Sequence, residues 1–300
     1  MSTRSKALLA VITGNTIFGF SFLFSKLALQ VAHPSVLLAV RFFCAFLVLN
    51  VLVLIGRAFN VKALSFSLKG KPLKYILLLA IFQPVLYFLC ETYGIVYTSS
   101  AYAGTIIAVV PLAGVIFDIL ILHADVGRKQ VICALLSIVG VVITSIGAEG
   151  MKSSFLGTLI LLGAVVSGAL FYVFSQKSGE DFNPLEQTYV MFAAGTVVYG
   201  IYAMIQCGGD FDTQILGALM LPRFYIGISY LSVLSSVVAF MCLNYGTARI
   251  TVSEASIFAN LTTVISILAG VIILGEIFTL QQIIGAAIIL IAVYLSSRTT

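Results

Sequence analysis

The chain has 300 residues, of which 61% are hydrophobic and only 9% are charged, and its net charge is +5. A water-soluble domain is nearer half apolar and a quarter charged, so this chain has too few charged side chains to cover its surface in water. The composition excludes a disordered chain, a coiled coil and an ordinary soluble enzyme, and it predicts a fold surrounded by lipid.

Ten mostly apolar runs follow one another along the chain, separated by charged or turn-forming breaks. A helix needs about 20 such residues to cross a hydrocarbon core of about 30 Å. The runs are continuous rather than alternating, which argues against a membrane β-barrel. We therefore predict an all-α membrane protein with ten transmembrane helices, at 7–31, 35–56, 73–97, 100–122, 129–148, 155–176, 185–207, 222–246, 252–274 and 279–297.

Lysines and arginines are distributed unevenly around these runs. If the N-terminus is cytoplasmic, twelve of them lie on the cytoplasmic side and only Lys152 and Arg223 lie outside. This asymmetry predicts that both termini are cytoplasmic. The first run is too long for a signal peptide and contains Lys26, so we expect it to be retained as a helix. We interpret the net positive charge as an orientation signal, so no nucleic-acid partner is expected. The basic loop 57–74 is placed to touch anionic lipid.

The chain repeats itself with an offset near 150 residues. The matching positions are Pro34 with Pro184, Pro72 with Pro222, Lys26 with Lys177, Tyr93-Gly94 with Tyr245-Gly246, and Gln130 with Gln282. The prolines stand where helices begin, a position that proline tolerates. Each half holds five spans, and since five is odd the second half enters the membrane from the opposite side. We predict two inverted five-helix repeats, at 1–150 and 151–300; the alternative is that duplication only enlarges a bundle.

Several short motifs occur in a fixed order along the chain. They are the segment 17–26, Pro34 followed by Arg41, the segment 93–101, Pro111, and Leu274-Gly275-Glu276 followed by Gly285. Their order and spacing resemble the drug/metabolite transporter superfamily, specifically its EamA-type ten-helix members. The resemblance covers essentially the whole chain and implies a transporter of the prokaryotic plasma membrane. It departs from the family where His123-Ala124 replaces the first-half equivalent of Gly275-Glu276, so that glutamate is missing or displaced to Asp125.

Three ionisable residues, Lys26, Arg41 and Glu91, fall inside predicted spans at a similar depth. Each costs about 2.5–3.5 kcal/mol on insertion scales and therefore needs an explanation. Two cations and one carboxylate leave one positive charge for an anionic substrate group, and the planar fork of Arg41 suits a carboxylate or a phosphate. The alternative is an Arg41–Glu91 pair that neutralises itself while Lys26 reaches outward.

Polar residues also recur at helical spacing. Gln83, Tyr87 and Glu91 stand four residues apart, which predicts that they share one face of the third helix. Such stripes either face a water-filled cavity or join helices to one another. The predicted substrate-binding residues are Asn15, Lys26, Arg41, Gln83, Tyr87, Glu91, Tyr102, Ser236, Asn244 and Asn260.

Other features of the spans carry structural expectations. Pro84 and Pro111 fall within predicted helices, where proline favours a kink. Asp118, Glu186 and Glu254 fall near the cytoplasmic helix ends, where we expect water to solvate them.

The sequence favours a secondary transporter that exports or exchanges small polar metabolites such as amino acids by alternating access. The alternative is a nucleotide-sugar or sugar-phosphate antiporter of the same superfamily, and a channel or an intramembrane enzyme is less favoured. The chain lacks HExxH, GxSxG and P-loop patterns, and its five cysteines are scattered, so no cofactor or metal is expected. A proton or a counter-substrate is the candidate for coupling. The sequence does not distinguish a monomer from a homodimer.

Overall fold

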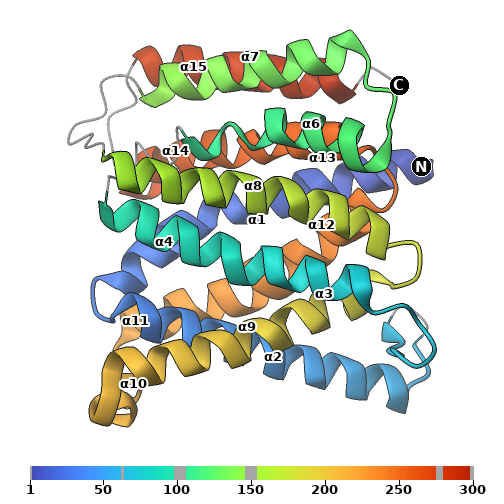
Figure 1. The fold of residues 1–300 in the computed structure, drawn as a ribbon. Helices are drawn as coiled ribbons and strands as arrows, with labels where there is room; N and C mark the ends of the chain where they lie inside the picture. Colours follow the sequence, from blue (N-terminus) through green and yellow to red (C-terminus); the bar gives the residue numbers. More distant parts are fainter. Residues whose placement is uncertain (1, 62–63, 98–105, 146–153, 275–279, 298–300) are drawn as a thin grey trace.

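The computed structural model describes residues 2–61, 64–97, 106–145, 154–274 and 280–297, and all regular structure in these ranges is helical (Figure 1). Prolines stand in the first turn of several helices, as the sequence predicts. Pro34, Pro184 and Pro222 open α2, α9 and α11, whereas Pro72 lies two residues before α3.

The described residues of the first half of the chain form six labelled helices. They are α1 (Thr3–Leu29), α2 (Pro34–Ala58), α3 (Lys74–Ala80), α4 (Tyr87–Tyr97), α6 (Val110–Leu122) and α7 (Arg128–Ser145). A π-helical segment, Ile81–Leu86, joins α3 to α4. Pro111 stands in the first turn of α6, so it begins this helix and does not kink it.

The second half contributes eight labelled helices. They are α8 (Phe155–Ser178), α9 (Pro184–Cys207), α10 (Phe211–Leu219), α11 (Pro222–Ser229), α12 (Ala239–Thr247), α13 (Val252–Ile257), α14 (Leu261–Leu274) and α15 (Leu280–Ser297). A second π-helical segment, Tyr230–Val238, joins α11 to α12, and a 3-10 turn, Phe258–Asn260, joins α13 to α14. Helix α10 lies in a stretch that the sequence analysis leaves without a helix.

Six helical segments of the described chain are long and apolar enough to cross a membrane. They are Thr3–Leu29, Pro34–Ala58, Lys74–Glu91, Phe155–Ser178, Pro184–Asp210 and Pro222–Thr247. Val110–Leu122 and Ile283–Ser296 are shorter apolar helices. Large apolar side chains such as Leu54, Leu120 and Ile205 are 62–73% exposed along these helices, which is the surface that acyl chains cover.

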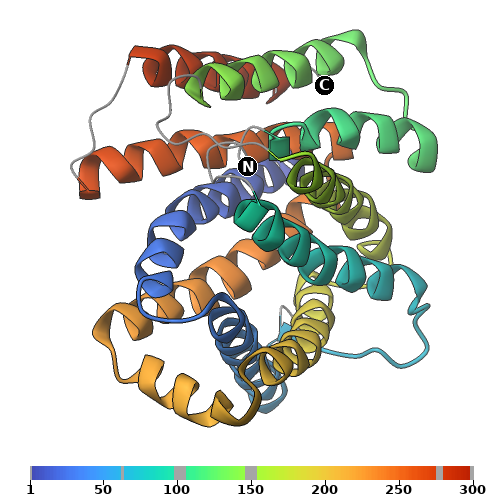
Figure 2. The same cartoon turned by 60° about the vertical axis from the view of Figure 1, so that its left-hand side comes forward.

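The two halves of the chain interleave. Helix α2 packs on α9, α4 packs on α8, and α1 packs on α12 and α14. Helices α7 and α15 form the most extensive pair and run side by side along one edge of the molecule in both views (Figures 1 and 2). A Cβ atom at Gly140 would lie 2.9 Å from the Gly285 carbonyl oxygen, so glycine permits this close approach.

One end of the helix bundle carries Arg4, Lys71, Lys177 and Arg249, and we call it the basic end. It lies on the right in Figure 1, where α1, α3 and α9 begin and where α8 and α15 end. An aromatic core lies between α2 and α9. Its central ring is Phe42, which stacks on Phe192 and Tyr199 with centroid distances of 5.2 and 5.0 Å.

Candidate functional site

Arg41 is the most buried cation in the described interior, with 6% of its surface exposed. Its Nε donates a hydrogen bond to the Ser236 hydroxyl at 3.0 Å, and its Nη2 donates to the Ser235 hydroxyl at 3.0 Å. The Ser21 hydroxyl donates to Ser235 at 2.7 Å. These four residues, which we call the Arg41 cluster, join α1 and α2 of the first half to the second half.

Both serine partners lie in the π-helical segment Tyr230–Val238. π-Helical turns are rare and are often found at functional sites. Here two consecutive side chains bind one guanidinium, so the segment provides two neutral oxygen acceptors for a single buried charge.

Aromatic rings complete the surroundings of the guanidinium. Its central carbon lies 5.0 Å from the ring centre of Phe88 and 5.7 Å from that of Phe42, distances at which a ring attracts a cation. Within the described part of the chain, no carboxylate forms an ion pair with Arg41. The buried charge is held by hydroxyl groups and rings, without an ion-pair partner among the described residues.

Tyr87 and Glu91 form the second polar pair of the interior. The Tyr87 hydroxyl donates to Glu91 Oε1 at 3.3 Å, which confirms that these two residues share a face of α4. Glu91 and Arg41 are close enough to interact electrostatically, but they make no ion pair within 4.0 Å. The self-neutralised Arg41–Glu91 pair is therefore absent from this conformation. Tyr172 of α8, which is 5% exposed, lies close enough to Tyr87 to interact with it.

Gln83 does not continue this face, because the helix predicted over 73–97 is kinked at this point, which confirms the kink expected at Pro84. Gln83 is buried, but its backbone has φ −146° and ψ 124°, outside helical geometry. The reason is Pro84, which has no N–H and disfavours a helical conformation in the residue before it. The Tyr199 hydroxyl donates to the Val85 carbonyl oxygen at 2.9 Å, which satisfies a backbone group in the interrupted segment.

Asn244 lies apart from the Arg41 cluster, toward the basic end. Its side chain is fully buried, donates to the Thr188 hydroxyl at 3.1 Å and accepts from the Ser175 hydroxyl at 2.8 Å. These contacts join α12 to α8 and α9. They give Asn244 the helix-joining role that polar residues also play in membrane bundles.

Asn15 and Asn260 are also engaged by protein partners. Asn15 donates to the Val11 carbonyl oxygen at 2.8 Å, and Asn260 donates to the Ser137 hydroxyl at 3.0 Å. Neither residue has a hydrogen bond to the Arg41 cluster in the described chain. Lys26 lies in α1, but its side chain is outside what the structure describes, and Tyr102 lies outside the described residues altogether.

The carboxylates near the basic end are buried, so the expectation that water solvates them is wrong. Glu186 is 2% exposed and accepts from Lys71 Nζ at 2.6 Å and from the Ser67 amide at 2.8 Å. Asp118 is 1% exposed and accepts from both the amide and the hydroxyl of Ser253, at 2.9 and 2.6 Å. In both cases the contact joins the first half of the chain to the second.

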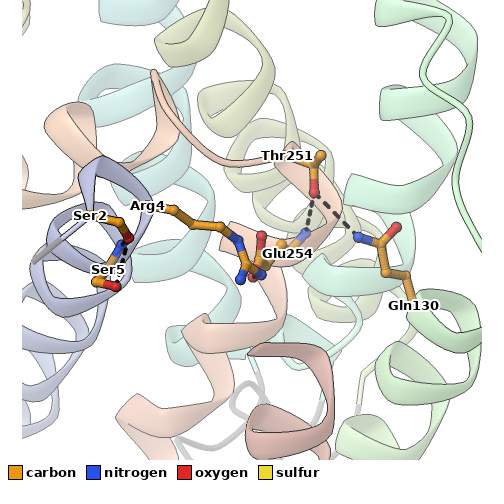
Figure 3. Close-up of polar contacts among 6 residues, drawn as sticks. All are labelled: Ser2, Arg4, Ser5, Gln130, Thr251 and Glu254. Carbon is orange, nitrogen blue, oxygen red and sulfur yellow. Dashed lines mark hydrogen bonds and ion pairs between the residues drawn. The ribbon is translucent and has the colours of Figure 1, made fainter. Parts of the chain in front are cut away.

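Glu254 forms the third contact of this kind, shown in Figure 3. It is 1% exposed and accepts from Arg4 Nη2 at 2.8 Å. Beside it, the Thr251 hydroxyl accepts from the Glu254 amide and from the Gln130 side chain, at 3.2 and 3.4 Å. We call the contacts of Asp118, Glu186 and Glu254 the carboxylate contacts. They are satisfied by hydrogen bonds or by a cation, and they join the two halves at the basic end.

A cavity of about 320 Å³ lies at the same end. Its lining includes Lys71, Gln187, Asn244 and Arg249, together with the turn between α8 and α9. It is separate from the Arg41 cluster, none of whose residues lines it.

Comparison with known proteins decides the family. The EamA-like transporter family matches residues 5–146 and matches again at 155–298. The chain belongs to the EamA-like transporter family. Its membership confirms the resemblance to the drug/metabolite transporter superfamily, and the double match agrees with the internal repeat found in the sequence.

Two relatives and one solved structure illustrate the similarity. The chain is 34% identical over 294 residues to the uncharacterized transporter YcxC of Bacillus subtilis, covering 97% of this chain and 92% of the relative. It is 23% identical to an uncharacterized transporter of Archaeoglobus fulgidus, covering 94% and 95% of the two chains. A crystal structure with 18% identity matches 98% of this chain and 96% of its own chain with a TM-score of 0.73, which shows a shared fold.

Within this EamA-family transporter, sequence reasoning missed Ser21 and Ser235. Ser21 is a hydroxyl group in an apolar run, and helical spacing places Ser235 off the face of its neighbour Ser236. The burial of Glu186 and Glu254, in contrast, could have been expected from a pattern in the sequence. Asn183 and Thr251 each stand three residues before a glutamate, the spacing of a helix capping box, and the structure shows that box at Asn183 and Glu186.

Proposed function

We propose that this EamA-family transporter is a secondary carrier that exports or exchanges a small polar metabolite by alternating access. The Arg41 cluster binds an anionic group of that metabolite. The observation that carries the proposal is a guanidinium with 6% exposure whose described partners are neutral hydroxyls and rings. A charge held in this way keeps its attraction for a carboxylate or phosphate that enters the interior.

The proposed topology has ten spans in two inverted halves, with both termini cytoplasmic and the basic end at the cytoplasmic face of the plasma membrane. Three observations support it. The twelve-to-two distribution of lysines and arginines favours this orientation, and α1 begins where α15 ends. The two π-helical segments, Ile81–Leu86 and Tyr230–Val238, lie about 150 residues apart, which supports structural equivalence of the halves.

In this topology the Arg41 cluster lies in the outer half of the membrane, because Arg41 follows the outer start of α2 by seven residues, or about 10 Å. The carboxylate contacts lie on the cytoplasmic side. The conformation is therefore that of a carrier closed toward the cytoplasm. Alternating access requires these contacts between the halves to separate when the site opens inward.

Amino acids and similar carboxylates are the proposed substrate class, because one guanidinium suits one anionic group. Glu91 is the proposed site of a coupled proton. Its hydrogen-bond donor among the described side chains is the neutral Tyr87 hydroxyl, so no cation is bound to the carboxylate. Exchange against a second substrate is the other mode of coupling that the arrangement permits.

The test is transport by purified protein in liposomes. Thermal-shift screening first selects a ligand from amino acids, sugar phosphates and nucleotide sugars, because a ligand that binds the folded state raises its stability. Saturable uptake and counterflow of that ligand are then measured for the wild type, Arg41→Gln and Arg57→Gln. Arg57 lies on the same helix but is exposed at its other end, so it controls for loss of a charge.

We expect Arg41→Gln to reduce transport at least about a hundredfold, the scale of a lost charge-assisted hydrogen bond pair, and Arg57→Gln to transport normally. Normal transport by folded Arg41→Gln would refute the assignment of the site. Flux that neither saturates nor shows counterflow would indicate a channel in place of a carrier.

A further inference from the structure

Two lysines from different helices converge on one aromatic ring at the basic end. Lys74 Nζ lies 5.5 Å from the ring centre of Tyr75, and Lys177 Nζ lies 5.2 Å from the same centre. Lys74 opens α3 in the first half of the chain, and Lys177 lies in the last turn of α8 in the second half. Helices α3 and α8 pack against each other, so the pair is fixed by the fold.

Neither ammonium group has a carboxylate partner in the described chain. Lys71, three residues before Lys74, is different because it is paired with Glu186. Two like charges held near one ring repel each other, and the ring attracts each of them only weakly. An anion bound by both lysines would remove this repulsion.

The surface that follows the lysines along the helices is apolar. Leu77 and Ile81 follow Lys74 at helical spacing, and they are 50% and 47% exposed. Beside them, Phe174 of α8 stacks on Tyr75 and on Phe82, with centroid distances of 6.3 and 5.4 Å. The patch therefore begins with two cations at one end of the helices and continues along them as aliphatic and aromatic side chains.

We propose that this patch binds an anionic phospholipid of the cytoplasmic leaflet. Lys74 and Lys177 bind its phosphate, and an acyl chain lies along Leu77 and Ile81. A free phosphate would satisfy the lysines but would leave the apolar surface unused, so the combination favours a lipid. The inference rests on the proposed topology, which places the basic end at the cytoplasmic headgroup region, where anionic lipids attract lysines. Because the lipid joins α3 to α8, it holds together parts of the two halves.

The test compares lipid binding by the wild type, Lys74→Gln/Lys177→Gln and Lys6→Gln/Lys129→Gln. The last pair is the matched control, since it removes two exposed charges at the same end of the molecule but away from Tyr75. Each detergent-purified protein is titrated with dioleoylphosphatidylglycerol, with dioleoylphosphatidylcholine and with inorganic phosphate. Native mass spectrometry reports the bound lipid, and thermal unfolding reports the stabilisation.

We expect phosphatidylglycerol to bind the wild type and the control alike. It should bind Lys74→Gln/Lys177→Gln about thirtyfold more weakly, because each lysine contributes about fivefold. Lys74→Arg/Lys177→Arg, which keeps both charges, should retain binding. Unchanged binding by the glutamine pair, an equal loss in the control, or equal stabilisation by inorganic phosphate would each overturn the proposal. Arg41→Gln should bind phosphatidylglycerol normally. The lipid proposal can therefore fail or hold independently of the transport proposal, which the Arg41→Gln transport assay tests.

Discussion

The Arg41 cluster and the two glutamate contacts of the basic end, at Glu186 and Glu254, stabilise buried charge in opposite ways. At the basic end, Glu186 and Glu254 each face a cation, and the Glu186 carboxylate also accepts hydrogen bonds from the Ser67 and Asn183 amides. In the interior, the described partners of Arg41 are the hydroxyl groups to which it donates hydrogen bonds and the aromatic rings beside it. A charge that is neutralised by the protein holds the protein together, whereas a buried charge that is not neutralised remains available to a ligand.

The largest expected effect on stability is at the basic end. Glu186→Ala removes the partner of Lys71 and leaves the Ser67 amide without its acceptor. We expect the free energy of unfolding to fall by about 2–3 kcal/mol, below the usual range for a fully buried pair because Lys71 is 28% exposed. Denaturant unfolding in detergent measures the change. Glu180→Ala, an exposed carboxylate in the preceding turn, should have almost no effect, and an equal loss in both variants would contradict the assigned role of Glu186.

A smaller effect is expected at Asn244, which tests where the binding site ends. Asn244→Ala leaves buried hydroxyls of Ser175 and Thr188 without their amide partner, and should cost about 1–2 kcal/mol of stability. Substrate affinity, measured on the folded fraction, should stay within about twofold of wild type, because neutral helix-joining contacts are distant from the charge that binds the ligand. A large loss of affinity with unchanged stability would place Asn244 in the substrate site.

Periodicity and composition predicted much of the fold because both depend on local rules. Apolar runs located the helices, and paired prolines marked the helix starts and the repeat. Arg41 was identifiable because an ionisable residue inside an apolar run is costly. What the sequence concealed depends on tertiary contacts. Ser235 binds Arg41 and Ser21 from another part of the chain, and no local pattern marks these contacts. The displacement of Gln83 from the face of Tyr87 follows from the neighbouring Pro84, so it was within reach of the sequence.

The most direct measurement of the central claim compares the affinity of the carrier for an anionic ligand and for its neutral amide analogue. If the unneutralised charge of Arg41 binds the anionic group, the wild type should prefer the carboxylate over the amide by about a hundredfold, and Arg41→Gln should bind both with similar affinity. Isothermal titration of both ligands against both proteins gives the four affinities. An equal preference for the carboxylate in the wild type and in Arg41→Gln would contradict the account, because the charge that selects the substrate would then lie elsewhere.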